Sequence, residues 1–103
     1  MGAYVVIWRY RVDPSQQAKF AKAHGPKGDW AKLFAGSKDY RGTELLADDE
    51  RPGEYVTIER WASQEAYSAY LAEHEAEVDR LDRRGEALTA SDSRLGAYGP
   101  VDP

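Results

Sequence analysis

The stretch EYVTIERWASQEAYSAYLAEH, residues 54–74, contains the change from strand to helix that decides the fold. Residues 54–61 are rich in β-branched and aromatic side chains, which are typical of a β-strand. Ser63 stands where a helix N-cap is expected, because its hydroxyl can accept a hydrogen bond from the first turn. We therefore predict a strand that leads into a long helix over residues 64–87.

The predicted long helix has one apolar face and one charged face. The apolar stripe keeps helical phase throughout and predicts one continuous helix packed on a sheet. Its members are Tyr67, Tyr70, Leu71, His74, Val78, Leu81, Gly85 and Leu88. We expect the opposite face to be solvated, and it carries Glu73, Glu77, Arg80, Asp82, Arg83 and Arg84.

Upstream of this stretch the sequence predicts a hairpin, and before it a strand and two helices. Residues 40–47 are the expected hairpin partner of residues 54–61, joined by an acidic loop that ends in Pro52-Gly53. Residues 3–12, AYVVIWRYRV, predict a strand that starts apolar on both faces. Cap and stop signals predict helices from Asp13 to about His24 and over residues 29–34.

With a last short strand at residues 93–98, the order is β-α-(α)-β-β-α-β. This order predicts an α+β, ferredoxin-like domain: a four-stranded antiparallel sheet with its main helices on one face. The other face would then expose apolar side chains, so we expect a homodimer that covers it. Residues 1–98 are the predicted domain, and residues 99–103 a flexible tail.

Composition excludes several classes of function. The 14 basic residues are scattered among 18 acidic ones, for a net charge of −4, which argues against a nucleic-acid partner. No long apolar run or leader segment indicates a membrane or secretory protein, so a cytoplasmic location is expected. The absence of cysteine excludes thiolate chemistry. The three Trp, seven Tyr and two Phe exceed what a thin core needs, which indicates a ring-lined interface or ligand cavity.

Several motifs resemble one family across nearly the whole chain. The block His24-Gly25-Pro26-Lys27-Gly28-Asp29-Trp30-Ala31-Lys32-Leu33-Phe34 is similar to a "G-P-x-G-x-W-x-x-L-F" pattern of the antibiotic-biosynthesis-monooxygenase family. So are the stretches 42–46 (GTELL), 60–67 (RWASQEAY), 88–89 (LT) and 95–98 (LGAY). The resemblance implies a dimeric α/β barrel and oxygenation of electron-rich aromatic polyketides such as anthrones, without metal or flavin.

Such chemistry needs a ring-lined cavity, one base and a donor for the developing enolate. His74, on the apolar stripe, is our candidate base; the alternative is a core-edge histidine bonded to backbone or to a Tyr. Arg60 or a Tyr is the candidate oxyanion donor; for Arg60 the alternatives are a structural pair with Glu44 or Glu59 and a place at the dimer contact. The candidate substrate-binding rings, which could equally be core, are Trp30, Phe34, Trp61, Tyr67 and Tyr70.

Metal and haem sites are not expected. Adjacent residues Glu73, His74 and Glu75 point about 100° apart on a helix, so they cannot converge on one ion. The haem-degrading branch of the superfamily has an Asn on the first strand, where this chain reads Val6-Ile7-Trp8-Arg9. The sequence thus predicts a cofactor-independent monooxygenase of a small aromatic substrate. Two alternatives remain: a non-catalytic ligand-binding or structural dimer, and an isomerase or cyclase.

Overall fold

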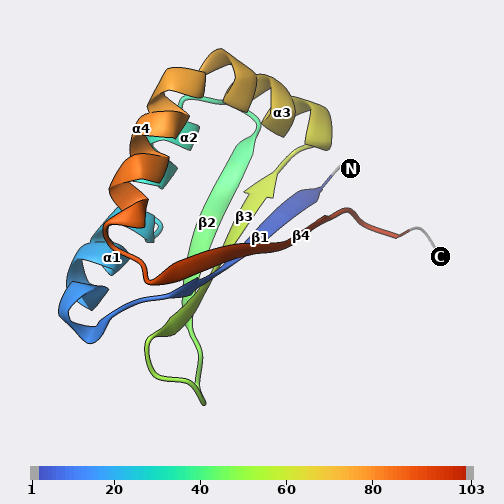
Figure 1. The fold of residues 1–103 in the computed structure, drawn as a ribbon. Helices are drawn as coiled ribbons and strands as arrows, with labels where there is room; N and C mark the ends of the chain where they lie inside the picture. The colour runs from blue at the N-terminus through green and yellow to red at the C-terminus, as the bar shows by residue number, and fades with distance from the viewer. Residues whose placement is uncertain (1–2, 102–103) are drawn as a thin grey trace.

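The computed structural model describes residues 3–101. Its strands are β1 (Tyr4–Arg11), β2 (Tyr40–Ala47), β3 (Glu54–Trp61) and β4 (Ser91–Tyr98). Its α-helices are α1 (Gln17–His24), α2 (Asp29–Phe34), α3 (Gln64–Glu73) and α4 (Glu75–Glu86), and a 3₁₀ turn, η1 (Pro14–Gln16), precedes α1. The strands form one antiparallel sheet in the order β2-β3-β1-β4. All the helices lie on one face of this sheet (Figure 1), which confirms the predicted ferredoxin-like α+β fold.

Most helices and strands begin and end close to the residues that the sequence predicts. The bounds of β2 and β3 are those expected, whereas β4 begins two residues earlier, at Ser91. Asp13 caps the first helical turn, since its carboxylate accepts from the Ser15 backbone N–H at 2.9 Å. Ser63 caps α3 by accepting from the Ala66 N–H at 3.1 Å.

The prediction of one continuous helix over residues 64–87 is wrong at His74. The backbone there leaves helical geometry, with φ −118° and ψ 30°, so α3 ends at Glu73 and α4 begins at Glu75. In Figure 1, α3 crosses one end of the sheet and α4 turns to follow its side. The apolar stripe does not reveal the break. Only one residue leaves helical geometry, so the apolar residues before and after His74 keep nearly the spacing of a continuous helix.

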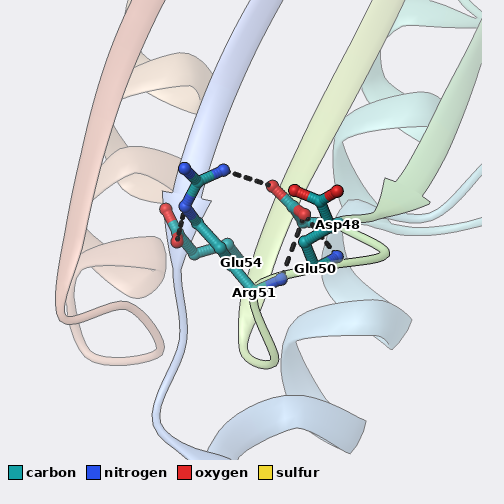
Figure 2. A network of polar contacts seen from close by, with 4 residues as sticks. All are labelled: Asp48, Glu50, Arg51 and Glu54. Carbon is teal, nitrogen blue, oxygen red and sulfur yellow. Dashed lines mark hydrogen bonds and ion pairs between the residues drawn. The ribbon is translucent and has the colours of Figure 1, made fainter.

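The loop between β2 and β3 is held by its own polar contacts (Figure 2). The Asp48 carboxylate accepts hydrogen bonds from the backbone N–H groups of Glu50 at 2.8 Å and Arg51 at 3.1 Å. The Arg51 guanidinium lies 3.6 Å from Asp48 and 3.8 Å from Glu54. Gly53 adopts φ 86°, a left-handed conformation that favours glycine. The predicted hairpin with a solvated loop is confirmed.

Strand alternation divides the sheet into a covered and an uncovered face. The buried core lies between helices and sheet and consists of Val6, Tyr10, Val12, Phe20, Ala31, Phe34 and Trp61. On the opposite face Val5, Ile7, Val56 and Ile58 stay half-buried, and Leu46 is 46% exposed. Within residues 3–101, no helix has the length and apolar character that crossing a membrane requires.

The predicted tail lies only partly within the described residues. Residues 99–101 are exposed and have no regular secondary structure. Residues 102–103 of that tail, and residues 1–2 of the predicted domain, lie outside the described part of the chain.

Candidate functional site

A partly enclosed cavity of about 180 Å³ lies between the helices and the sheet. A cavity of roughly 150 Å³ can hold one benzene molecule, so this space suits one substituted aromatic ring. Its apolar wall is made of Trp8, Tyr10, Trp30, Phe34, Tyr67, Leu71, Val78 and Leu81. Its polar and titratable members are His24, Glu59, Asp82, Thr89 and Asp92, with Gly85 completing the lining.

Glu59 is the most unusual of these groups. The alternation of β3 directs Thr57, Glu59 and Trp61 toward the helices, and all three are buried. Glu59 is only 8% exposed, and within residues 3–101 its carboxyl group has neither a hydrogen-bond nor an ion-pair partner. Burial raises the pKa of Glu59 to about 7, although the positive charge of Arg94 acts in the opposite direction. Near neutral pH this carboxyl can therefore both take up and release a proton.

His24, the last residue of α1, also belongs to the cavity lining. Its ring stacks on Phe20, with ring centroids 4.4 Å apart, and its Nδ1 lies 3.4 Å from the Phe20 carbonyl oxygen. Burial is the main cause that lowers the pKa of His24, so the imidazole is neutral at pH 7. Nε2 is directed toward Gly85, where an added Cβ would lie 3.8 Å away.

Tyr67 links the cavity to a more polar groove beside it. That groove is lined by Tyr4, Ser63, Ser68 and Arg94, and Tyr67 contributes to both spaces. The Tyr67 ring packs against Tyr4 and Trp61, with centroids 5.5 Å from each. Burial, and after it the charge of Glu59, raise the pKa of the Tyr67 hydroxyl to about 12. The hydroxyl therefore remains a hydrogen-bond donor at every pH near neutrality.

The structure separates the five predicted binding rings into two groups. Trp30, Phe34 and Tyr67 line the cavity. Trp61, which is 1% exposed, packs instead against Phe34, with centroids 5.1 Å apart, and lies outside the lining. Tyr70 also lies outside it, and its hydroxyl donates a hydrogen bond to the Leu33 carbonyl at 2.5 Å. Their roles in substrate binding stay predictions.

The two predicted catalytic residues lie away from the cavity. His74 is outside the lining, and its Nδ1 is 3.0 Å from the Tyr70 carbonyl oxygen. Arg60 is exposed on the uncovered sheet face, where its Nη2 lies 2.8 Å from the Glu44 carboxylate. These are the contacts expected of the structural alternatives for both residues. A catalytic role for either remains a prediction.

Sequence reasoning missed Glu59 and His24 as site residues. For Glu59 a signal was available: it occupies the same strand face as Thr57 and Trp61, two positions from each. A carboxyl on a strand face that also carries a large ring is a candidate for burial. For His24, which falls at a predicted helix end, no local signal indicated that it would be 6% exposed.

The glycines of the HGPKGDW segment bring α2 to the cavity. An added Cβ at Gly28 would lie 2.4 Å from the carbonyl oxygens of both Lys22 and Ala23. The loop can therefore pack directly on the end of α1 only without a side chain at this position. This close approach places Trp30 and Phe34 in the cavity wall. Among residues 3–101, no group of three His, Asp or Glu side chains is placed to hold a metal ion.

The fold and the cavity define a class of ferredoxin-like domain with a ring-lined space between helices and sheet. The sequence matches the model of the antibiotic biosynthesis monooxygenase family over residues 3–78, so the chain belongs to that family. The resemblance seen in the motifs is thereby confirmed. No curated protein matches the sequence.

Solved structures with this fold come from distant relatives. SnoaB from Streptomyces nogalater, a cofactor-independent oxygenase, is 19% identical with a TM-score of 0.66, over 100% of this chain and 97% of its own. Rv0793 from Mycobacterium tuberculosis is 15% identical with a TM-score of 0.70, over 98% and 97%. A conserved protein from Methanosarcina mazei is 12% identical with a TM-score of 0.71, over 95% and 92%. At these identities the likeness concerns the fold.

Proposed function

We propose that this protein is a cofactor-independent oxygenase that acts on a small electron-rich aromatic molecule, with Glu59 as the base. The observation that carries the proposal is a buried carboxyl group without a partner, of pKa about 7, in the wall of a ring-lined cavity. Family membership and the likeness to an oxygenase fold support the reaction class. The cavity volume favours a substrate built on one substituted ring.

The reaction needs no oxidant other than O₂. Glu59 would take a proton from an acidic C–H or O–H group of the substrate, which leaves an electron-rich enolate or phenolate. That anion would give one electron to O₂, and recombination of the two radicals would form a C–O bond. Glu59 would then return its proton to the peroxide anion. Loss of water from the resulting hydroperoxide turns a CH₂ group into a carbonyl, so one O₂ yields one carbonyl and one water. Tyr67, as a neutral donor, would stabilise the negative oxygen of the substrate.

Oxygen uptake tests the proposal. Phenols of one and two rings, and the three-ring ketone anthrone with its acidic CH₂ group, would be assayed with and without added flavin and a chelator. The Glu59→Gln variant should lose at least a hundredfold in rate, because the amide cannot accept the proton. Glu44→Gln, on the neighbouring strand but exposed, is the matched control and should keep full activity. Full activity of the Glu59 variant would overturn the proposal.

The same assay separates the alternative functions. Substrate conversion without oxygen uptake would favour an isomerase or cyclase of the same fold. Tight binding of aromatic ligands with no conversion would favour a non-catalytic binding protein. The contact of His74 with the Tyr70 carbonyl and the ion pair of Arg60 with Glu44 are compatible with that alternative.

We further propose that the protein is a homodimer. The support is the sheet face that carries Ile7, Val56 and Ile58, because no helix of the described chain covers it (Figure 1). Light scattering should give twice the 11.6 kDa mass of one chain. Ile58→Glu should give the monomer mass, since a charge on that face would be buried unpaired in a dimer. A wild-type monomer at micromolar concentration would exclude the proposal.

A further inference from the structure

One end of the cavity carries acidic side chains, and the cation that acts on Glu59, Arg94, belongs to the neighbouring groove. Glu59, Asp82 and Asp92 all belong to the lining, and no Lys or Arg is among the described residues that form it. Within residues 3–101, neither aspartate has a hydrogen-bond or ion-pair partner through its side chain. Three carboxyl groups in a lining without a cationic side chain give the cavity a negative potential, which Arg94 in the neighbouring groove offsets only in part and which a neutral phenol does not require.

Two consecutive elements, α4 and β4, bring the aspartates to this end. Asp82 follows Val78 and Leu81 on α4 and precedes Gly85, so it lies on the helix face that closes the cavity. Asp82 is exposed, as expected for the solvated face of that helix, and it also belongs to the cavity lining. Asp92 comes from β4, where it pairs with Tyr10 of β1. Nearby negative charges, Asp92 among them, add to burial in raising the pKa of Asp82.

Rings surround the same space. Trp8, Tyr10 and Trp30 belong to the lining together with the two aspartates. Aromatic faces attract a cation electrostatically, most strongly when water is partly excluded. Glu59, buried to more than nine-tenths and without a partner, gives the cavity a further negative group that a ligand must satisfy. Rings combined with unpaired carboxylates are the chemistry of a site for an organic cation.

From this juxtaposition we propose that the cavity selects substrates that carry a protonated amine, held at Asp82 and Asp92, with the aromatic ring directed toward Glu59. Register sets the spacing: Glu59 pairs with Val6 and Asp92 with Tyr10, four residues or roughly 13 Å further along β1. The two residues flank that strand, which adds roughly 10 Å across the sheet. The inference rests on the proposed function for the role of Glu59. Asp82 and Asp92 lie beyond residue 78, where the family match ends.

Binding of three ligands that share one ring tests the proposal without any turnover. Tyramine, 4-ethylphenol and 3-(4-hydroxyphenyl)propionate are cationic, neutral and anionic at pH 7.5, and Trp fluorescence or calorimetry would measure their affinities. Tyramine should bind at least tenfold more tightly than 4-ethylphenol, and the propionate most weakly. The ratio of the affinity for tyramine to that for 4-ethylphenol should decrease in 0.5 M salt.

Variants assign the preference to the two aspartates. Asp82→Asn with Asp92→Asn should reduce the advantage of tyramine to less than threefold and leave 4-ethylphenol unchanged. Asp79→Asn, on the same helix but outside the lining, is the matched control and should keep the advantage. Equal binding of the three ligands, no binding of tyramine, or an unaltered preference in the double variant would each overturn the proposal.

The two proposals fail in different ways. A preference for tyramine with no oxygen uptake from any substrate would remove the oxygenase and keep the cation site. Oxygen uptake that depends on Glu59, with no preference for amines, would keep the oxygenase and remove the cation site.

Discussion

The imidazole of His74 stacks on the ring of Tyr70, with centroids 4.0 Å apart, while its Nδ1 lies 3.0 Å from the Tyr70 carbonyl oxygen. The His74 backbone N–H donates to the same carbonyl, at 3.1 Å. These contacts occur at the residue where α3 ends and α4 begins. His74 therefore has a structural role, because its contacts with Tyr70 hold the junction between the two helices.

The first prediction concerns His74→Ala. Loss of one hydrogen bond and one ring contact should lower the free energy of unfolding by about 1–2 kcal/mol, measured by urea denaturation. Oxygen uptake per folded molecule should stay within twofold of wild type, because His74 does not line the cavity. A variant that folds with unchanged stability but has lost its activity would instead support His74 as the base.

The second prediction is a pH profile. The groups near the Glu59 carboxyl are Arg94, Tyr67, Tyr10 and Tyr40. His24, Asp82 and Asp92 lie elsewhere in the lining. Because the carboxylate is the active form and its pKa is about 7, oxygen uptake should rise as pH increases through 7. A rate already constant from pH 5 upward would exclude Glu59 as the base.

The third prediction concerns stability and the same carboxyl. A pKa raised by folding, from 4.5 to about 7, means that the folded state binds the proton more tightly than the unfolded state. The free energy of unfolding should therefore fall as pH rises from about 4.5 to 7, by up to about 3 kcal/mol. Glu59→Gln should remove most of this fall in urea titrations at several pH values, whereas Glu44→Gln should leave it in place.

The fourth prediction uses Gly85, which lies in α4 and faces the His24 ring. An added Cβ would meet that ring at 3.8 Å, an ordinary contact distance. Gly85→Ala should raise the free energy of unfolding by about 0.5–1 kcal/mol, because alanine favours the helix. Gly85→Leu should fill the cavity and weaken the binding of 4-ethylphenol at least tenfold. Unchanged binding in the leucine variant would contradict the location of the site.

The fifth prediction concerns Arg60→Ala. Both members of the Arg60–Glu44 pair are half exposed, so its loss should change the free energy of unfolding by less than about 1 kcal/mol. Oxygen uptake, assayed at the protein concentration used for wild type, should remain at the wild-type level. A large decrease in kcat would instead support the role of oxyanion donor.

Much of the architecture could be predicted from local chemistry. The bounds of β2 and β3, the Ser63 cap and the hairpin loop depend on side chains within a few positions of one another. Such interactions act over one turn or one strand pair, so the sequence pattern contains them. The motifs likewise indicated the family that residues 3–78 match.

The candidate site depends on contacts that no local pattern contains. Glu59 acquires its raised pKa only because helices from both halves of the chain exclude water from one face of β3. Asp82 and Asp92 share a cavity because α4 packs across the sheet and β4 returns beside β1. The sequence by itself determined the elements, their order and the face of each that is apolar. Only the tertiary structure decided which polar groups lose their water and which charges face one another, since desolvation and Coulomb interactions depend on distances between segments remote along the chain.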